Sequence, residues 1–146
     1  MRHSKKIQLS LCVALLIATA ACRGKGATTT AGTAGVRVTE VTLGRSIGGD
    51  KAIADRTESF KPNDTIYASV ATDGSSPSAT LRAKWTFEDS QIVDESTRTI
   101  APNTLERTEF HISKPNGWPA GKYKVEVFLN DQAAGTKSFE VHGSAP

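Results

Sequence analysis

The sequence predicts an all-β fold, a two-sheet sandwich of about seven antiparallel strands. From Val36 onward, apolar and polar residues alternate with a period of two, which is typical of half-buried strands. The alternating segments are short, and clusters of Gly, Pro, Asn, Asp and Ser separate them. No segment carries a convincing apolar stripe at helical spacing. Short strands at this spacing within residues 36–146 favour two sheets packed face to face.

The first strand changes its own phase. Val36 and Val38 occupy even positions, whereas Val41 and Leu43 occupy odd ones. A regular strand cannot bury both pairs on one face, because successive side chains point to opposite sides. We therefore predict a β-bulge or a switch between sheets at Thr39-Glu40.

Residues 44–59 lack a periodic pattern and are expected to form an irregular loop, with a helical turn at residues 50–56 as the alternative. Strands follow at residues 64–72 and 80–88, and a shorter, weaker strand is expected at residues 91–95. The inward residues predicted for the two longer strands are Ile66, Ala68, Val70, Leu81, Ala83, Trp85 and Phe87.

Three more strands are predicted, at residues 104–113, 122–130 and 136–142. Their predicted inward residues are Phe110, Ile112, Tyr123, Val125, Val127, Leu129, Phe139 and Val141. The last two strands form a hairpin, in which we expect Lys124 opposite Glu140 and a three-residue loop. The neighbouring register would place Glu126 opposite Glu140, and directly opposed like charges are destabilising.

The start of the 122–130 strand resembles strand F of immunoglobulin-like domains. It reads Gly121-Lys122-Tyr123-Lys124-Val125, and in those domains a tyrosine two residues before a core position bonds back across the end of the sandwich. Trp85 matches their core tryptophan. Val125 stands where antibody domains carry a cysteine, so the resemblance is to cysteine-free immunoglobulin-like or fibronectin-like modules of bacterial envelope proteins. It covers nearly all of residues 36–146.

Residues 1–21 contain the parts of a secretory signal peptide. A basic head that ends at Lys6 precedes an apolar run from Ile7 to Ile17, and small residues follow. Ala20-Ala21-Cys22 resembles the lipobox of bacterial lipoproteins, which implies cleavage before Cys22 and acylation of its thiol and new amine. The alternative is ordinary cleavage at Ala18-Thr19-Ala20, which would give a soluble periplasmic protein.

The lipoprotein resemblance also implies a location. Three acyl chains on Cys22 would hold the protein permanently on a membrane, since two already suffice for stable anchoring. Arg23 follows the cysteine instead of the Asp that retains enteric lipoproteins in the inner membrane, so we expect the outer membrane, facing the periplasm. Residues 22–35 form the lipidated cysteine and a tether rich in Gly, Ala and Thr. Such a flexible segment spans roughly 20 Å.

Composition narrows the classes of partner. The formal charge of the whole chain is +3, but Arg2, Lys5 and Lys6 leave with the signal peptide, and 15 basic residues then balance 15 acidic ones. A neutral chain gives no reason to expect nucleic acid as a partner. Cys12 leaves with the signal and Cys22 is expected to be acylated, so the domain must fold by core packing without a disulfide.

The residues that could carry chemistry do not form a recognisable set. Glu109 and His111 on one strand face are half a metal site, and His142 is the other histidine of the domain. Acidic residues gather at Glu88, Asp89, Asp94 and Glu95 without the spacing of a calcium loop. Gly44-Arg45-Ser46-Ile47-Gly48 has the Gly-x-Ser-x-Gly spacing, but it opens the stretch expected to be an irregular loop and not the strand-to-helix turn that this motif needs, and no Ser-x-x-Lys motif is present. We therefore predict no catalytic residue, no metal site and no cofactor.

Two aromatic residues are candidates for partner binding. Trp118 lies in a Pro- and Gly-rich loop, where it could either anchor a partner or fold under the end of the sandwich. Phe128 interrupts an otherwise polar outer row, with Lys122, Lys124 and Glu140 as its expected polar rim. The expected function is a lipid-anchored envelope module that binds or spaces a protein partner, and the alternative is a small-ligand, carbohydrate-binding or protease-inhibitory domain.

Overall fold

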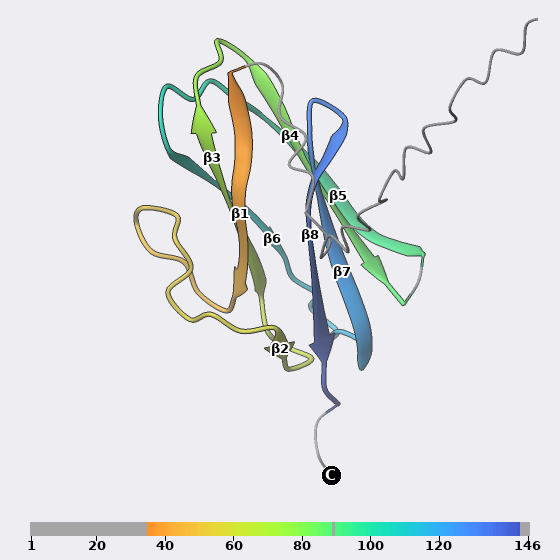
Figure 1. Cartoon of the computed structure of the whole chain (residues 1–146). Helices are drawn as coiled ribbons and strands as arrows, with labels where there is room; N and C mark the ends of the chain where they lie inside the picture. The colour runs from red at the N-terminus through yellow and green to blue at the C-terminus, as the bar shows by residue number, and fades with distance from the viewer. Residues whose placement is uncertain (1–34, 89, 144–146) are drawn as a thin grey trace, which may run out of the picture.

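The computed structural model describes residues 35–88 and 90–143, and this part of the chain is entirely β-structure with turns and loops. Eight strands form two sheets that face each other, which confirms the predicted sandwich (Figure 1). The predicted signal peptide, Cys22 and nearly all of the tether lie outside the described residues.

The smaller sheet has three strands and the larger has five. The small sheet has the order β1-β3-β6, and the large sheet has the order β2-β8-β7-β4-β5. All neighbouring strands are antiparallel except β2 and β8. The strand bounds are β1 Val36–Gly44, β2 Ser59–Phe60, β3 Ile66–Gly74, β4 Ala79–Phe87, β5 Gln91–Ile100, β6 Glu106–Ile112, β7 Gly121–Leu129 and β8 Gln132–Val141.

The core between the sheets contains the inward rows that the alternation predicted. Trp85 is fully buried, and its indole ring meets the Phe139 ring edge-on, with 5.9 Å between the centroids. Phe139 also stacks on Tyr123 at 5.3 Å and meets Phe60 edge-on at 5.4 Å. Of the predicted inward residues, Phe87 alone is only half-buried. These aromatic contacts join β2, β4, β7 and β8 around one side chain.

The predicted phase change in β1 is confirmed as a β-bulge. Val38 lies opposite Thr72 and Glu40 lies opposite Ala71, so Thr39 is the extra residue. The bulge lets both apolar pairs of β1 face the core, although they differ in parity. The strand stays in one sheet along its whole length.

Strand β5 is longer than the sequence predicted. The predicted strand ends at residue 95, but β5 continues to Ile100, the one residue of the strand that is buried. The small sheet has two strands fewer than the large one, so β5 projects beyond it. Only Val93 and Ile100 of β5 pack on the core, and the other residues need no apolar alternation, which explains why the pattern ended too early.

The register predicted for the last hairpin is wrong. Glu140 lies opposite Lys122 instead of Lys124, and a bulge between Val127 and Phe128 shifts the pairing near the turn. A two-residue turn, Asn130-Asp131, replaces the expected three-residue loop, and both of its residues have positive φ, 48° and 64°. Such a turn matches the twist of the strands, and it determined the register. Glu140 still faces a lysine, so like charges are not opposed at this position.

The loop after β1 contains no helical turn. It folds back on itself through isolated bridges between Gly44 and Arg56 and between Ile47 and Ile53. The hydroxyl of Ser69 on β3 donates to the carbonyl of Lys51 at 2.6 Å, so the loop packs on the small sheet. It ends in the unpredicted two-residue strand β2, which pairs in parallel with β8.

Candidate interaction surface

Phe128 lies on the outer face of the large sheet, as its position in the alternation predicted. It is half-buried because Arg82, directly opposite on β4, covers its ring. The guanidinium carbon of Arg82 lies 4.2 Å from the ring centroid, a short cation–π contact. The middle of the loop after β1 packs instead on the small sheet, where the carbonyl of Lys51 accepts the Ser69 hydroxyl.

Arg82 is held in place by two carboxylates. Its guanidinium nitrogens lie 3.4 Å from Glu95 on β5 and 3.4 Å from Asp131 in the β7–β8 turn. Both contacts are partly exposed, so each adds little to stability. Together they orient the guanidinium over Phe128. The result is a surface of one guanidinium over one aromatic ring, the Arg82–Phe128 patch, on β4 and β7 beside Glu95 of β5.

The predicted polar rim occupies the other half of this face. Lys122 pairs across the strands with Glu140, and Lys124 lies 3.5 Å from Glu126. A shallow hollow of about 460 Å³ lies here, and its lining includes Glu58, Glu88, Lys122, Lys124 and Glu140. Phe128 does not line this hollow. The rim and the Arg82–Phe128 patch are therefore adjacent features of one face, and the rim residues do not encircle the phenylalanine.

Trp118 does not provide an exposed aromatic surface, which corrects its choice as a partner-binding candidate. It is 6% exposed and folds under the end of the sandwich. Its indole nitrogen donates to the carbonyl of Asp64 at 3.0 Å, and its ring meets Tyr123 edge-on at 6.1 Å. A tryptophan with an apolar body and one satisfied donor is stable in this position. Trp118 thus joins the loop before β7 to the start of β3.

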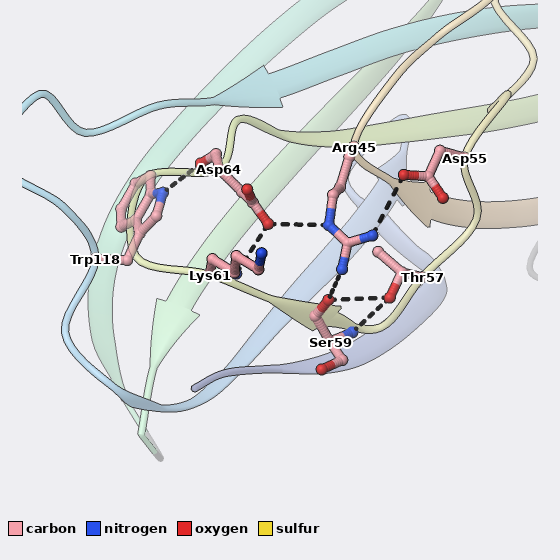
Figure 2. Close-up of polar contacts among 7 residues, drawn as sticks. All are labelled: Arg45, Asp55, Thr57, Ser59, Lys61, Asp64 and Trp118. Carbon is pink, nitrogen blue, oxygen red and sulfur yellow. Dashed lines mark hydrogen bonds and ion pairs between the residues drawn. The ribbon is translucent and has the colours of Figure 1, made fainter. Parts of the chain in front are cut away.

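Arg45 organises the same end of the sandwich, and no local sequence pattern indicated it. Figure 2 shows its guanidinium between two carboxylates and a carbonyl. Nε donates to Asp64 at 3.0 Å, one terminal nitrogen lies 3.3 Å from Asp55, and the other donates to the carbonyl of Ser59 at 2.8 Å. Hydrogen bonds to Asp64 and, second, to Asp55 raise the pKa of Arg45.

Asp64 links this cluster to its neighbours. Its carboxylate also accepts a hydrogen bond from the backbone nitrogen of Lys61 at 2.8 Å, while its carbonyl receives the Trp118 indole (Figure 2). The cluster therefore holds the loop after β1, strand β2 and the loop before β7 together. Its charges are internally paired, which assigns it a structural role at the end of the sandwich where β1 finishes.

Tyr123 makes the hydrogen bond that the immunoglobulin-like resemblance implied. Its hydroxyl donates to the carbonyl of Pro119 at 2.8 Å, four residues upstream. Burial raises the pKa of the Tyr123 phenol, and the negative charge of Glu88 raises it further. Both effects favour the neutral phenol that can donate this bond.

Glu109 and His111, the two residues that could form half a metal site, gain no third ligand within the described part of the chain. Glu109 and His111 contact each other on β6, and the His111 ring lies 5.4 Å from Tyr67. Among the described residues, no group of three or more His, Cys, Asp or Glu side chains is placed to hold a metal ion. The Glu88 carboxylate instead accepts a hydrogen bond from the backbone nitrogen of Lys122, and the Glu95 carboxylate accepts one from the Arg82 guanidinium. Asp89 lies outside the described residues.

Comparisons with known proteins give likenesses to solved structures only. No protein-family model matches the chain, and no curated protein matches it. One similar structure is an immunoglobulin-like protein from Pseudomonas aeruginosa, which is 17% identical. The match covers 73% of this chain and 96% of that protein, at a TM-score of 0.47. The β-sandwich fold of this chain is shown by its own two sheets, with the strand orders β1-β3-β6 and β2-β8-β7-β4-β5.

Other similar structures are parts of larger enzymes. A β-glucosidase from Listeria innocua, in complex with glucose, is 8% identical at a TM-score of 0.49, and the match covers 73% of this chain and 16% of the enzyme. The alkylpurine DNA glycosylase AlkC of Pseudomonas fluorescens is 15% identical at 0.43, and 30% of it is covered. The chain thus spans a minor part of either enzyme's length. None of the described residues forms a helix long and apolar enough to cross a membrane.

Proposed function

We propose that this protein is a lipid-anchored module of the bacterial cell envelope that binds a protein partner and has no catalytic activity. The observation that carries the proposal is the sequence Ala20-Ala21-Cys22 after a basic head and an apolar run. An immunoglobulin-like sandwich suits this role because such domains present rigid faces and edges to partners. The one match to a nucleophile motif, Gly44-Arg45-Ser46-Ile47-Gly48, lies where β1 runs into a loop and lacks the strand-to-helix turn of a nucleophile elbow, so it does not argue for an enzyme.

The topology suggests how an anchored domain would stand on the membrane. Strand β1 begins beside the end of β3, where Val36 faces Gly74 and Ser75 donates to the carbonyl of Gly35 at 2.6 Å. The tether would enter at this end, together with the β7–β8 turn (Figure 1). The Arg45 cluster and Trp118 would then point away from the membrane. Phe128 lies one residue before the end of β7 and therefore on the tethered half.

The burial of Trp118 supports a protein module over a carbohydrate-binding domain. A sugar site of that kind would use an exposed aromatic ring as a stacking platform, and the Trp118 ring is covered. The Arg82–Phe128 patch offers a ring under a guanidinium instead. Arginine and aromatic side chains are enriched where proteins bind one another.

The anchor is tested by replacing the acylated residue. Cys22→Ser should move the protein from the membrane fraction to the soluble fraction and abolish incorporation of labelled palmitate. Cys12→Ser is the matched control, because Cys12 lies in the apolar run and should leave both readouts unchanged. A Cys22→Ser protein that stays in membranes with unchanged mass would contradict lipidation. Density-gradient separation of inner and outer membranes then locates the anchored protein.

A further inference from the structure

Strand β5 is an open edge that packs principally against β4. It pairs with β4 on one side and ends the order of the large sheet on the other. Nine of its ten residues, Gln91 to Thr99, are exposed or half-exposed. A free strand edge offers unpaired backbone groups to any strand that can align with it.

The hydrogen bonds of β4 show which groups of β5 are free. Glu88 donates to the carbonyl of Lys122 at 2.8 Å, and Asn130 donates to that of Thr80 at 2.8 Å, so even-numbered residues of β4 bond to β7. The odd-numbered residues of β4 therefore bond to β5, and they lie opposite its even-numbered residues. The backbone groups of Glu95, Thr97 and Thr99 consequently point away from the sheet.

Between residues 94 and 98, the β5 side chains that point inward are those of Asp94, Ser96 and Arg98. They lie opposite the buried β4 residues Trp85, Ala83 and Leu81, respectively. Neither Asp94 nor Arg98 has an ion-pair partner within residues 35–88 and 90–143. The guanidinium carbon of Arg98 lies 5.9 Å from the Phe110 ring, at the outer limit of a cation–π contact. A negative and a positive charge thus stand two residues either side of Ser96, both available to a partner.

We propose that β5 pairs with β5 of a second copy of this chain, antiparallel about a two-fold axis at Ser96. In this register Asp94 of each copy faces Arg98 of the other, and the backbone bonds form between Glu95 and Thr97. Asp94 and Arg98 occupy a non-hydrogen-bonded pair, where opposed side chains are closest. A two-fold axis forms this ion pair twice, as in other self-complementary interfaces.

The other symmetric registers are less favourable. Centring the axis on Glu95 places two glutamates directly opposite each other, and centring it on Arg98 opposes two arginines. Centring it on Thr97 places Asp94 opposite Ile100 and leaves Arg98 opposite Ser96. Some registers would place an inward residue of one copy opposite an outward residue of the other. These are excluded, because the small sheets of the two copies would then lie on opposite faces of the joined large sheet. Charge complementarity therefore selects the axis at Ser96.

Single cysteines test the register. The background is the full chain with Cys12→Ser and Cys22→Ser, so the result does not depend on whether Cys22 carries lipid. In the proposed dimer, the Cα atoms at position 96 lie about 4.5 Å apart, within the range of a disulfide. Ser96→Cys should therefore give a disulfide-linked dimer under mild oxidation. Thr99→Cys is the matched control, because its two copies would be about 20 Å apart.

Charge reversal tests the ion pairs in the same background. Asp94→Arg and Arg98→Asp should each be monomeric alone in sedimentation velocity, because each then opposes like charges. Mixing the two variants should restore a dimer, since every pair in the mixed species joins opposite charges. Circular dichroism checks that both variants stay folded, which the exposure of β5 favours.

Two results would overturn the proposal. The first is Ser96→Cys forming no more covalent dimer than Thr99→Cys. The second result has two parts. The mixture of the two charge-reversed variants stays monomeric, and the protein with native Asp94 and Arg98 is monomeric as well. A strand of a different protein as the true occupant would give this second result, and self-pairing would then be wrong.

Discussion

Trp85→Ala tests the core of the sandwich most directly. The side chain is fully buried on β4, and its indole nitrogen has no hydrogen-bond partner among the described residues. Its contribution is therefore apolar packing, including the edge contact with Phe139. Truncating a buried tryptophan to alanine costs about 3–5 kcal/mol. That is a large share of the roughly 5–15 kcal/mol that stabilises a typical domain.

Urea denaturation measures this loss, with Trp118 as the remaining fluorescent probe, since the chain has two tryptophans. The midpoint should fall while the slope stays constant, which would show that the unfolding reaction is otherwise unchanged. Trp85→Phe is the matched control. It keeps an aromatic ring and loses no hydrogen bond, so it should cost less than Trp85→Ala. A loss below about 1 kcal/mol for Trp85→Ala, the size of an ordinary substitution, would refute the assignment of this face to the core.

Three other substitutions test single contacts by the same unfolding assay. The buried hydroxyl of Thr86 has no partner in the described part of the chain, so Thr86→Val should raise the free energy of unfolding by about 1 kcal/mol, and a clear loss would indicate a hidden partner. Tyr123→Phe removes the bond to Pro119 and should cost about 1 kcal/mol. The raised pKa of Tyr123 adds stability below its ordinary pKa of 10.0 that is lost as pH rises through the higher folded value, and this alkaline loss should be smaller in Tyr123→Phe. Phe128→Ser should lower the free energy of unfolding by about 1 kcal/mol, because the ring is stacked on Arg82 but only half-buried. The same variant should capture less of any crosslinked envelope partner. A much larger loss of stability would place Phe128 in the core.

The sequence predicts strands well where one face packs on the core. In β3, β4 and β7 the apolar period follows directly from burial, so Val70, Trp85 and Val125 could all be assigned to the core. The bulge in β1 was also predictable, because an apolar row that changes parity can stay on one face only if the strand contains an extra residue. The bond of Tyr123 followed from a short motif with a known geometry.

Features that depend on distant segments were not predictable in this way. Strand β2 has only two residues, and it exists because Glu140 and Val141 lie beside it in the folded chain. The Arg45 cluster joins residues that only the folded loop brings together. The hairpin register is a different case. Asn130-Asp131 is a dipeptide that tolerates positive φ, and weighing it above the charge pattern would have indicated the two-residue turn.

The candidate surface was predicted only in part. An outward Phe128 follows from the alternation, but the contact with Arg82 requires the register between β4 and β7, which local sequence does not contain. For Trp118 the sequence left two alternatives, and the structure shows the one in which it folds under the end of the sandwich. Its burial depends on a hydrogen bond to Asp64, more than fifty residues away in the chain.

Strand β5 accounts for both a failure of prediction and the proposed dimer. Most of its residues are exposed, with Ile100 buried and Val93 partly buried against the core, and such a strand gains little from the hydrophobic effect. Natural proteins often place inward charges on such edges to prevent pairing between copies. A run of like charges would achieve this, because every register would then oppose equal charges. Asp94 and Arg98 instead carry opposite charges at equal distances from Ser96, so like charges meet when the axis lies on either of them, but opposite charges meet when it lies on Ser96.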